Sequence, residues 1–251
     1  MWLVLCELND PSALWAYEGL KIHGLDPLEI VSSEMLSCSL HWEHRLGSDG
    51  VSIKIRLADG RIINDFNVKG VLNRLSFVHS DHLYLVNGQD QNYAIQELNG
   101  LFLSWLNALP CPVLNRPSPY GLAGQWRHES EWFLLASKAG LSTPYYKQTS
   151  NPDQSKIIGS YEERISSLST TSVFVADGHV IGQDMPSNIA KGCQVLAELS
   201  KTALLGIEFD AKSTSNWVFI SATPSPDLRT GGHTLLGTLA ALLKDGSENS
   251  T

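Results

Sequence analysis

The sequence has little positive charge and no long hydrophobic run. Lys and Arg total 18 against 26 Asp and Glu, and the net charge of -8 leaves no broad basic surface for nucleic acid or anionic membranes. The first apolar run, WLVLC, ends at Glu7, whereas a membrane span needs roughly 20 apolar residues and a signal peptide also needs a longer apolar core. We therefore expect a cytoplasmic protein with neither nucleic acid nor membrane among its partners.

Cysteines are also few, and none forms a C-x-x-C pair. The four of them lie far apart among apolar or strand-like neighbours, at Cys6, Cys38, Cys111 and Cys193. Isolated cysteines among apolar neighbours favour buried free thiols over zinc ligands or disulfides. The sequence therefore predicts buried free thiols.

The N-terminal half predicts an α/β unit. The run WLVLCE precedes Asp10-Pro11-Ser12, which is typical of a helix start, and Gly24 ends that helix before the strand-like run PLEIVS. Such a strand-helix-strand unit builds a parallel sheet. The following residues, 37–64, alternate between apolar and polar and are broken by turns at 47–50 and 59–60, which predicts an antiparallel excursion of two or three strands.

The tetrapeptide VLNR occurs twice, at 71–74 and 113–116, with a helix expected from Asn92 onwards between the copies. Two neighbouring parallel strands with similar ends would explain the pair, and open α/β sheets bind ligands at the carboxyl ends of their strands. Arginine fits a carboxylate or phosphate with two parallel hydrogen bonds. The side chains are candidates for binding a small anion or the acidic end of a peptide; alternatively, the arginines tie loops to backbone carbonyls. The candidates are Asn73, Arg74, Asn115 and Arg116.

From Pro117 the composition changes, and we place a domain boundary near Ser118. The expected elements are a helix over 127–139, a polar segment at 145–172 with one short helix near 161–168, a hairpin in VFVADGHVIG, a helix over 187–203, the strands LLGIEFD and WVFISATPSP, and a final helix. The predicted domains are a small N-terminal α/β domain at 1–117, a second domain at 118–244 and a disordered tail at 245–251.

These elements resemble the ATP-grasp superfamily, and within it the ligases that join a carboxylate to an amine through an acyl phosphate. The resemblance rests on AGLSTP, VFVADGHVIG, LLGIEFD and WVFISATPSPDLR, in that order. It implies a small α/β domain of the pre-ATP-grasp kind followed by a truncated ATP-grasp-like domain. It also implies that the strand before SPDL ends at the cleft, which makes Arg229 a further binding candidate.

The sequence departs from the superfamily pattern in two places. The last core strand of ATP-grasp enzymes usually carries Glu-x-Asn for magnesium, whereas here the matching positions hold Ser221 and Thr223; Glu208 and Asp210 in GIEFD remain as metal candidates. Magnesium prefers anionic oxygen ligands, so a hydroxyl replaces a carboxylate poorly. The segment 145–172 is also shorter than the roughly 35 residues that a lid of four strands with their turns needs.

Two histidine motifs remain. In HWEHR, His41, Glu43 and Arg45 would share one face of a strand and His44 the other, which favours an exposed strand face over a metal site. In HSDH a loop holds His79 and His82, but zinc needs further ligands and none is clearly paired with them.

Three functions follow from these patterns. The first is an ATP-grasp-like protein that has lost ligase activity and serves as a binding or partner subunit, for example of an active relative. The second is an active ATP-dependent carboxylate-amine ligase that uses Glu208, Asp210 and a lysine of 147–156, in which case ATP and Mg²⁺ are the cofactors. The third is a protein that binds a small anionic metabolite with Arg74 and Arg116. A homodimer is the default expectation for the assembly.

Overall fold

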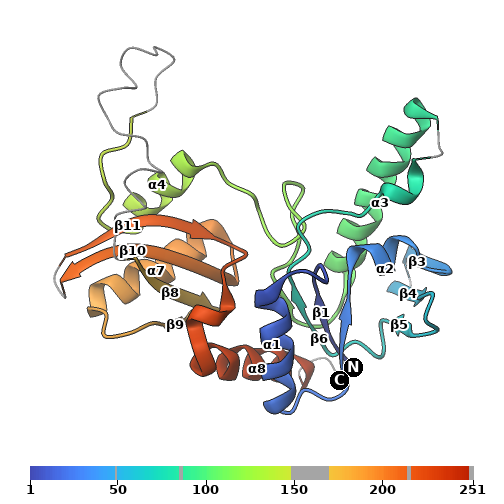
Figure 1. Cartoon of the computed structure of the whole chain (residues 1–251), viewed down its shortest axis with the longest axis horizontal. Helices are drawn as coiled ribbons and strands as arrows, with labels where there is room; N and C mark the ends of the chain where they lie inside the picture. The colour runs from blue at the N-terminus through green and yellow to red at the C-terminus, as the bar shows by residue number, and fades with distance from the viewer. Residues whose placement is uncertain (49, 85–86, 148–169, 214–215, 249–251) are drawn as a thin grey trace. The chain divides into compact units, whose positions relative to one another are not determined.

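The computed structural model (Figure 1) describes residues 1–48, 50–84, 87–147, 170–213 and 216–248. The chain divides into two compact units: unit 1 is Met1–Trp126 with Asp227–Thr251, and unit 2 is Arg127–Pro226. Within the described ranges, no helix is both long enough and apolar enough to span a bilayer.

Unit 1 contains the predicted parallel sheet. Its strands lie in the order β2-β1-β6-β7, and their bounds are Leu28–Val31, Trp2–Leu5, Gly70–Asn73 and Val113–Leu114. Helix α1 (Pro11–Ile22) follows β1, and its first turn is capped by Asp10, whose carboxylate accepts hydrogen bonds from two backbone N–H groups. The two VLNR strands are neighbours, as predicted, with Val71 opposite Val113.

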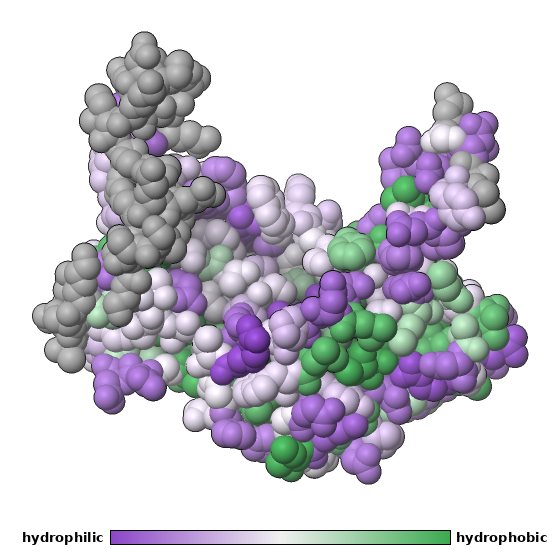
Figure 2. All heavy atoms as spheres, viewed as in Figure 1, coloured by the Kyte–Doolittle hydropathy of each residue, from purple (hydrophilic) through white to green (hydrophobic). Residues whose placement is uncertain are grey.

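The antiparallel excursion is also confirmed. Strands β3 (His41–Gly47), β4 (Gly50–Arg56) and β5 (Ile62–Asn64) pair in that order, after the short helix α2 (Ser33–Ser37). Farther along, a 3₁₀ turn, η1 (Asp81–Leu83), precedes the long helix α3 (Gly88–Ala108). The described side chains of 88–100 are not buried, and Figure 2 shows mostly hydrophilic side chains over this half of the helix.

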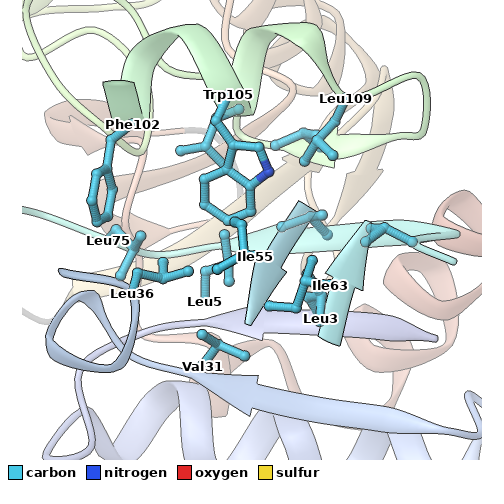
Figure 3. Packing of buried hydrophobic residues seen from close by; sticks show 14 of the residues in the cluster. Leu3, Leu5, Val31, Leu36, Ile55, Ile63, Leu75, Phe102, Trp105 and Leu109 are labelled. Carbon is cyan, nitrogen blue, oxygen red and sulfur yellow. The ribbon is translucent and has the colours of Figure 1, made fainter. Parts of the chain in front are cut away.

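The second half of α3 covers the core of unit 1. Phe102 and Trp105 are fully buried and lie above aliphatic side chains of β1, α2 and β4 (Figure 3). Trp42 of β3 packs against both rings, with centroid distances of 5.1 and 5.3 Å. Each such aromatic side chain buries a large apolar area, so this cluster anchors α3 on the two sheets.

The alternation of β3 follows the expectation from its sequence. Glu43 forms an ion pair with Arg45 and lies 3.5 Å from His41 Nε2, and these three side chains share the face that points away from the core. On the other face, His44 Nε2 lies 2.8 Å from Ser104 Oγ of α3. The rings of His79 and His82 lie 6.4 Å apart, and no group of three His, Cys, Asp or Glu side chains within the described ranges is placed to hold a metal ion.

The C-terminal segment belongs to unit 1. After η2 (Leu228–Gly231), helix α8 (Gly232–Glu248) packs on α1 and β6; a Cβ on Gly19 would lie 2.3 Å from Leu236 Cδ1. This grouping differs from the predicted second domain, which includes α8. The helix also continues to Glu248, past residue 245, where the tail was predicted to begin. The remaining tail residues 249–251 lie outside the described ranges, and the domain bounds stay a prediction.

Unit 2 is an antiparallel sheet packed against two helices. The sheet order is β11-β10-β8-β9, and α4 and α7 supply Phe133 and Leu196 to a core that includes Phe209 and Phe219 of the sheet. The bounds are α4 Glu129–Lys138, β8 Thr170–Ala176, β9 His179–Ile181, α7 Ser187–Ser200, β10 Leu204–Ser213 and β11 Asn216–Thr223. The predicted hairpin, helices and strands are confirmed, whereas the predicted short helix at 161–168 lies outside the described residues.

All four cysteines are free thiols, as expected. Cys6, Cys111 and Cys193 are buried, and burial raises the pKa of the Cys6 and Cys193 thiols to about 12. The prediction of burial is wrong for Cys38, which is exposed because it is the C-cap residue of the short surface helix α2.

Candidate functional site

The residues singled out from the sequence lie in two sets, one in each compact unit. The set in unit 2 lies on the sheet face that points away from α4 and α7. Glu208 pairs with Ser172 of β8 on one side and with Ser221 of β11 on the other. Directly opposed residues share a face, and Phe209 next in β10 belongs to the core, so these three polar side chains form a row on the outer face.

Glu208 is the carboxylate of this row. Its Oε1 accepts a hydrogen bond of 2.8 Å from Ser172 Oγ. Burial raises the pKa of Glu208, and the bond from Ser172 offsets part of that effect. Asp210 lies two residues farther along β10, opposite Thr170 and Val218, and therefore on the same face.

The residues that follow β11 pack against the end of the sheet beyond this row. Thr223 Oγ1 accepts a hydrogen bond of 3.1 Å from the backbone N–H of Ser225. The chain then turns back so that Pro226 covers Gly206 of β10, where a Cβ would lie 2.4 Å from Pro226 Cβ. The oxygen groups of this face are therefore the hydroxyls of Ser172 and Ser221 and the carboxylates of Glu208 and Asp210.

In unit 1, Asn73 and Asn115 lie together and are almost fully buried. Asn73 Nδ2 donates to Asn115 O at 2.8 Å and to Leu122 O at 2.7 Å. Both amide hydrogens of Asn73 are thus used to hold the loop that follows β7, so this residue has a clear structural role at the strand end.

Arg116 binds the carboxyl end of α3. Its Nη1 donates to the carbonyls of Leu106 and Asn107, and its Nη2 donates to those of Leu109 and Cys111, at 2.9–3.2 Å. The last carbonyls of a helix lack partners within the helix, and a guanidinium satisfies several of them at once. The contacts of Arg116 match the alternative in which the arginine ties a loop to backbone carbonyls.

Arg74 lies in a different place, at the start of α1. Its side chain is only 8% exposed, and its Nε donates to Asp10 Oδ2 at 2.8 Å. Burial would raise the pKa of Asp10, but the Arg74 bond and the backbone N–H groups of Ala13 and Ser12 hold it below its ordinary value. Asp10 therefore joins the helix cap to the candidate arginine.

Arg229 lies near Arg74 and Asp10. It forms a two-pronged ion pair with Asp227, with Nη2 2.6 Å from Oδ2. The pKa of Asp227 is lowered by Arg229 first and also by the nearby charge of Arg74, and Asp10 contributes to the raised pKa of Arg229. The structure thus brings Arg74 and Arg229 into one cluster, the charge cluster, in which Asp10 and Asp227 balance both arginines.

Sequence reasoning had missed the two aspartates of the charge cluster as partners. Asp10 was visible as a helix cap, and its link to Arg74 depends on β6 lying beside β1, with Asn73 opposite Leu5. The spacing Asp227-x-Arg229 was a local signal for an ion pair. Ser172 was missed as well, because its contact with Glu208 needs the register between β8 and β10.

No protein-family model and no curated protein sequence matches the chain. Solved structures do. The ATP-grasp ligase PsnB, complexed with a minimal precursor variant, Mg and ADP, has 18% identity and a TM-score of 0.70, over 98% of this chain and 98% of PsnB. Macrocyclase MdnB from Microcystis aeruginosa MRC has 13% identity and a TM-score of 0.69, over 98% of this chain and 99% of MdnB.

A third similar structure is the RiPP-associated ATP-grasp ligase of Chryseobacterium gregarium in complex with ADP and a leader and core peptide. It shares 11% identity at a TM-score of 0.72, over 97% of this chain and 96% of that ligase. The TM-scores establish the fold, whereas identities this low leave the activity open. Along almost its whole length, the chain has the α/β fold of the ATP-grasp ligases.

Proposed function

We propose that this protein has the ATP-grasp fold without ligase activity of its own and acts as a binding or partner subunit. One observation carries the proposal: the row across β8, β10 and β11 reads Ser172, Glu208, Ser221. In the superfamily pattern the last position is usually a carboxylate that holds magnesium. Here a neutral hydroxyl stands beside a glutamate whose pKa is already raised by burial.

The neighbouring position supports the same conclusion. Thr223 stands where an asparagine is usual, and its hydroxyl oxygen accepts a hydrogen bond from the turn that follows β11. Two departures at one candidate metal site weaken it more than either would alone, because magnesium binding depends on several hard oxygen ligands acting together.

The partner role draws support from proteins of the same fold. MdnC has been solved bound with its precursor peptide MdnA, and the Chryseobacterium gregarium ligase with a leader and core peptide. A peptide or protein is therefore the class of partner that we propose, either an active relative or another chain. Cytoplasmic location and a homodimer belong to the same proposal.

Calorimetry tests the loss of activity. We expect no heat when the purified chain is titrated with ATP and Mg²⁺ or with ADP, and no phosphate release with amine acceptors. The double variant Ser221→Glu/Thr223→Asn should gain Mg²⁺-dependent nucleotide binding, whereas the matched Ser221→Ala/Thr223→Ala should not. Micromolar binding together with turnover by the unaltered chain would overturn the proposal.

The second candidate is an active ATP-dependent carboxylate-amine ligase. It is favoured by the placement of Glu208 and Asp210 on one face of β10, where their carboxylates are two residues apart. Of the lysines expected to contribute, Lys147 is described and Lys156 lies outside the described residues. This candidate requires Glu208→Ala to abolish nucleotide-dependent turnover, and an unaffected variant would exclude it.

A further inference from the structure

The outer face of the β3-β4-β5 sheet carries a group of cations in an otherwise acidic protein. The inner face of this sheet packs on the core through Ile53 and Ile55 of β4. Because strand side chains alternate, the intervening residues of β4 and their partners in β3 point to the opposite face. The exposed members of that outer face include His41, Arg45, Ser52, Lys54 and Arg56.

Two of these cations, Lys54 and Arg56, have no acidic partner among the described residues. The acid of this face, Glu43, pairs with Arg45 and lies near His41 along its own strand. Lys54 lies directly opposite Glu43 in register, yet neither it nor Arg56 forms an ion pair with any residue in the described ranges. In a chain with a net charge of -8, such a pair of unmatched cations attracts an anionic partner.

Exposed apolar side chains lie on β5 and in the turn that follows it. Ile62 of β5 is 43% exposed and lies opposite Arg56 in register. Phe66, in the turn after β5, is 92% exposed. Two hydrogen bonds of 2.9 Å hold that turn. The backbone N–H of Asn64 donates to Asn67 Oδ1, and the backbone N–H of Asn67 donates to Asn64 Oδ1. The phenyl ring is thus presented on a fixed turn.

We infer that this face binds an extended acidic segment of a partner protein. Lys54 and Arg56 are two residues apart on one strand, which separates them by about 7 Å. Alternate residues of an extended peptide have the same spacing, so two carboxylates at positions i and i+2 match the two cations. An apolar side chain of the same segment would cover Ile62 and Phe66. The inference rests on the proposed function for the partner role alone.

The chemistry of the face favours an acidic protein segment over other polyanions. Affinity for nucleic acid depends on the number of phosphates neutralised, and two free cations on a protein of net charge -8 give a small electrostatic gain. Recognition of anionic lipids needs clusters of about 4–8 basic residues. A short peptide with two carboxylates needs only two cations at a matching distance, and Lys54 and Arg56 supply them.

Fluorescence anisotropy with labelled ten-residue peptides tests the inference. The probe carries Glu at alternate positions and one Phe, and the control peptide carries Gln in place of each Glu. We expect the unaltered chain to bind the acidic probe and not the Gln peptide, with weaker binding at higher salt. Lys54→Glu/Arg56→Glu should weaken binding at least tenfold, and Phe66→Ser about threefold.

The matched control is Lys138→Glu/Lys191→Glu, which makes the same change in net charge at exposed positions of unit 2. Retained binding in this control confirms a local effect, whereas an equal loss overturns the inference. So does failure of the unaltered chain to bind the acidic probe, or binding of duplex DNA or phosphatidylserine vesicles in its place. Nucleotide turnover by the unaltered chain would overturn the proposed function and leave this binding test unaffected.

Discussion

Asp10 joins two tasks in a single carboxylate. It caps α1 through the N–H groups of Ser12 and Ala13, and it pairs with the buried side chain of Arg74. Loss of a helix cap costs about 1 kcal/mol, and loss of one partner of a buried ion pair costs more because the other charge is left without compensation. This residue therefore connects the local stability of α1 with the charge cluster.

We predict that Asp10→Ala lowers the free energy of unfolding by about 2–4 kcal/mol at pH 7. Asp10→Asn should lose about half as much, because asparagine still caps the helix. The folded pKa of Asp10 is lowered, so its contribution is present above the unfolded pKa of about 3.9 and is lost as pH falls through the folded pKa. Urea unfolding at pH 7 and pH 3 measures this; an Asn variant that matches Ala at pH 7 would contradict it.

The pKa of Glu208 is shifted in the opposite direction to that of Asp10. Its folded pKa is raised, so the stability it contributes is present below the unfolded pKa of about 4.3 and is lost as pH rises through the folded pKa. We predict that Glu208→Gln melts at a higher temperature than the unaltered chain at pH 8 and at nearly the same temperature at pH 4. Thermal melts across this range measure the gap. Glu198→Gln, at an exposed position of α7, is the control, and a gap that is constant with pH would refute the prediction.

At the scale of elements, the end of α3 depends on a residue outside the helix. Arg116 donates to four carbonyls there, and two of them, those of Leu106 and Asn107, belong to the last turn of α3. The buried aromatic residues of α3 lie in the turns just before, so this cap fixes the part of the helix that covers the core.

We predict that Arg116→Met lowers stability by about 1–2 kcal/mol and speeds amide exchange over residues 104–111. Arg116→Lys should recover little, because an ammonium is a point donor and lacks the fork that reaches several carbonyls. Exchange measured by mass spectrometry, with α7 as the internal reference, tests this. Full recovery by lysine would show that charge rather than geometry matters at this position.

At the scale of the whole molecule, the chain returns to its first unit at the end. α8 packs on α1 and β6, and Trp2 Nε1 donates to Leu243 O at 3.4 Å. The buried leucines of this segment are Leu228, Leu235, Leu236, Leu239 and Leu243. Burying one leucine contributes about 1.5–3 kcal/mol, so the segment supports unit 1 by an amount comparable to the whole stability of a domain, about 5–15 kcal/mol.

We therefore predict that a chain ending after Pro226 does not fold unit 1, although it retains every strand of both sheets in that unit. Near-ultraviolet circular dichroism and limited proteolysis of the region 1–126 measure this. A chain ending after Glu248 removes the last three residues and serves as the control. A folded and protease-resistant unit 1 in the shorter chain would contradict the prediction.

Local pattern determined much of the fold. The cap at Asp10, the alternation of β3 and β4, the hairpin at Asp177-Gly178 and the two VLNR strand ends were all predicted, because each depends on neighbours within a few residues. Asp177 and Gly178 both have positive φ, 44° and 81°, as a tight hairpin turn requires. Resemblance in the order of these elements was also sufficient to predict the ATP-grasp fold.

Contacts between distant segments were decided by the tertiary structure. The sequence presented Arg74 and Arg116 as equivalent strand-end residues, yet Arg74 meets Asp10 across β1 and β6, whereas Arg116 turns to the end of α3. In the same way Glu208 meets Ser172 through strand register, and α8 joins unit 1 across more than 200 residues of sequence. Periodicity depends on residues that are close together in the sequence, so it can be recognised from the sequence alone. The partner of a polar side chain depends on which distant segments pack beside it, and only the tertiary structure determines that.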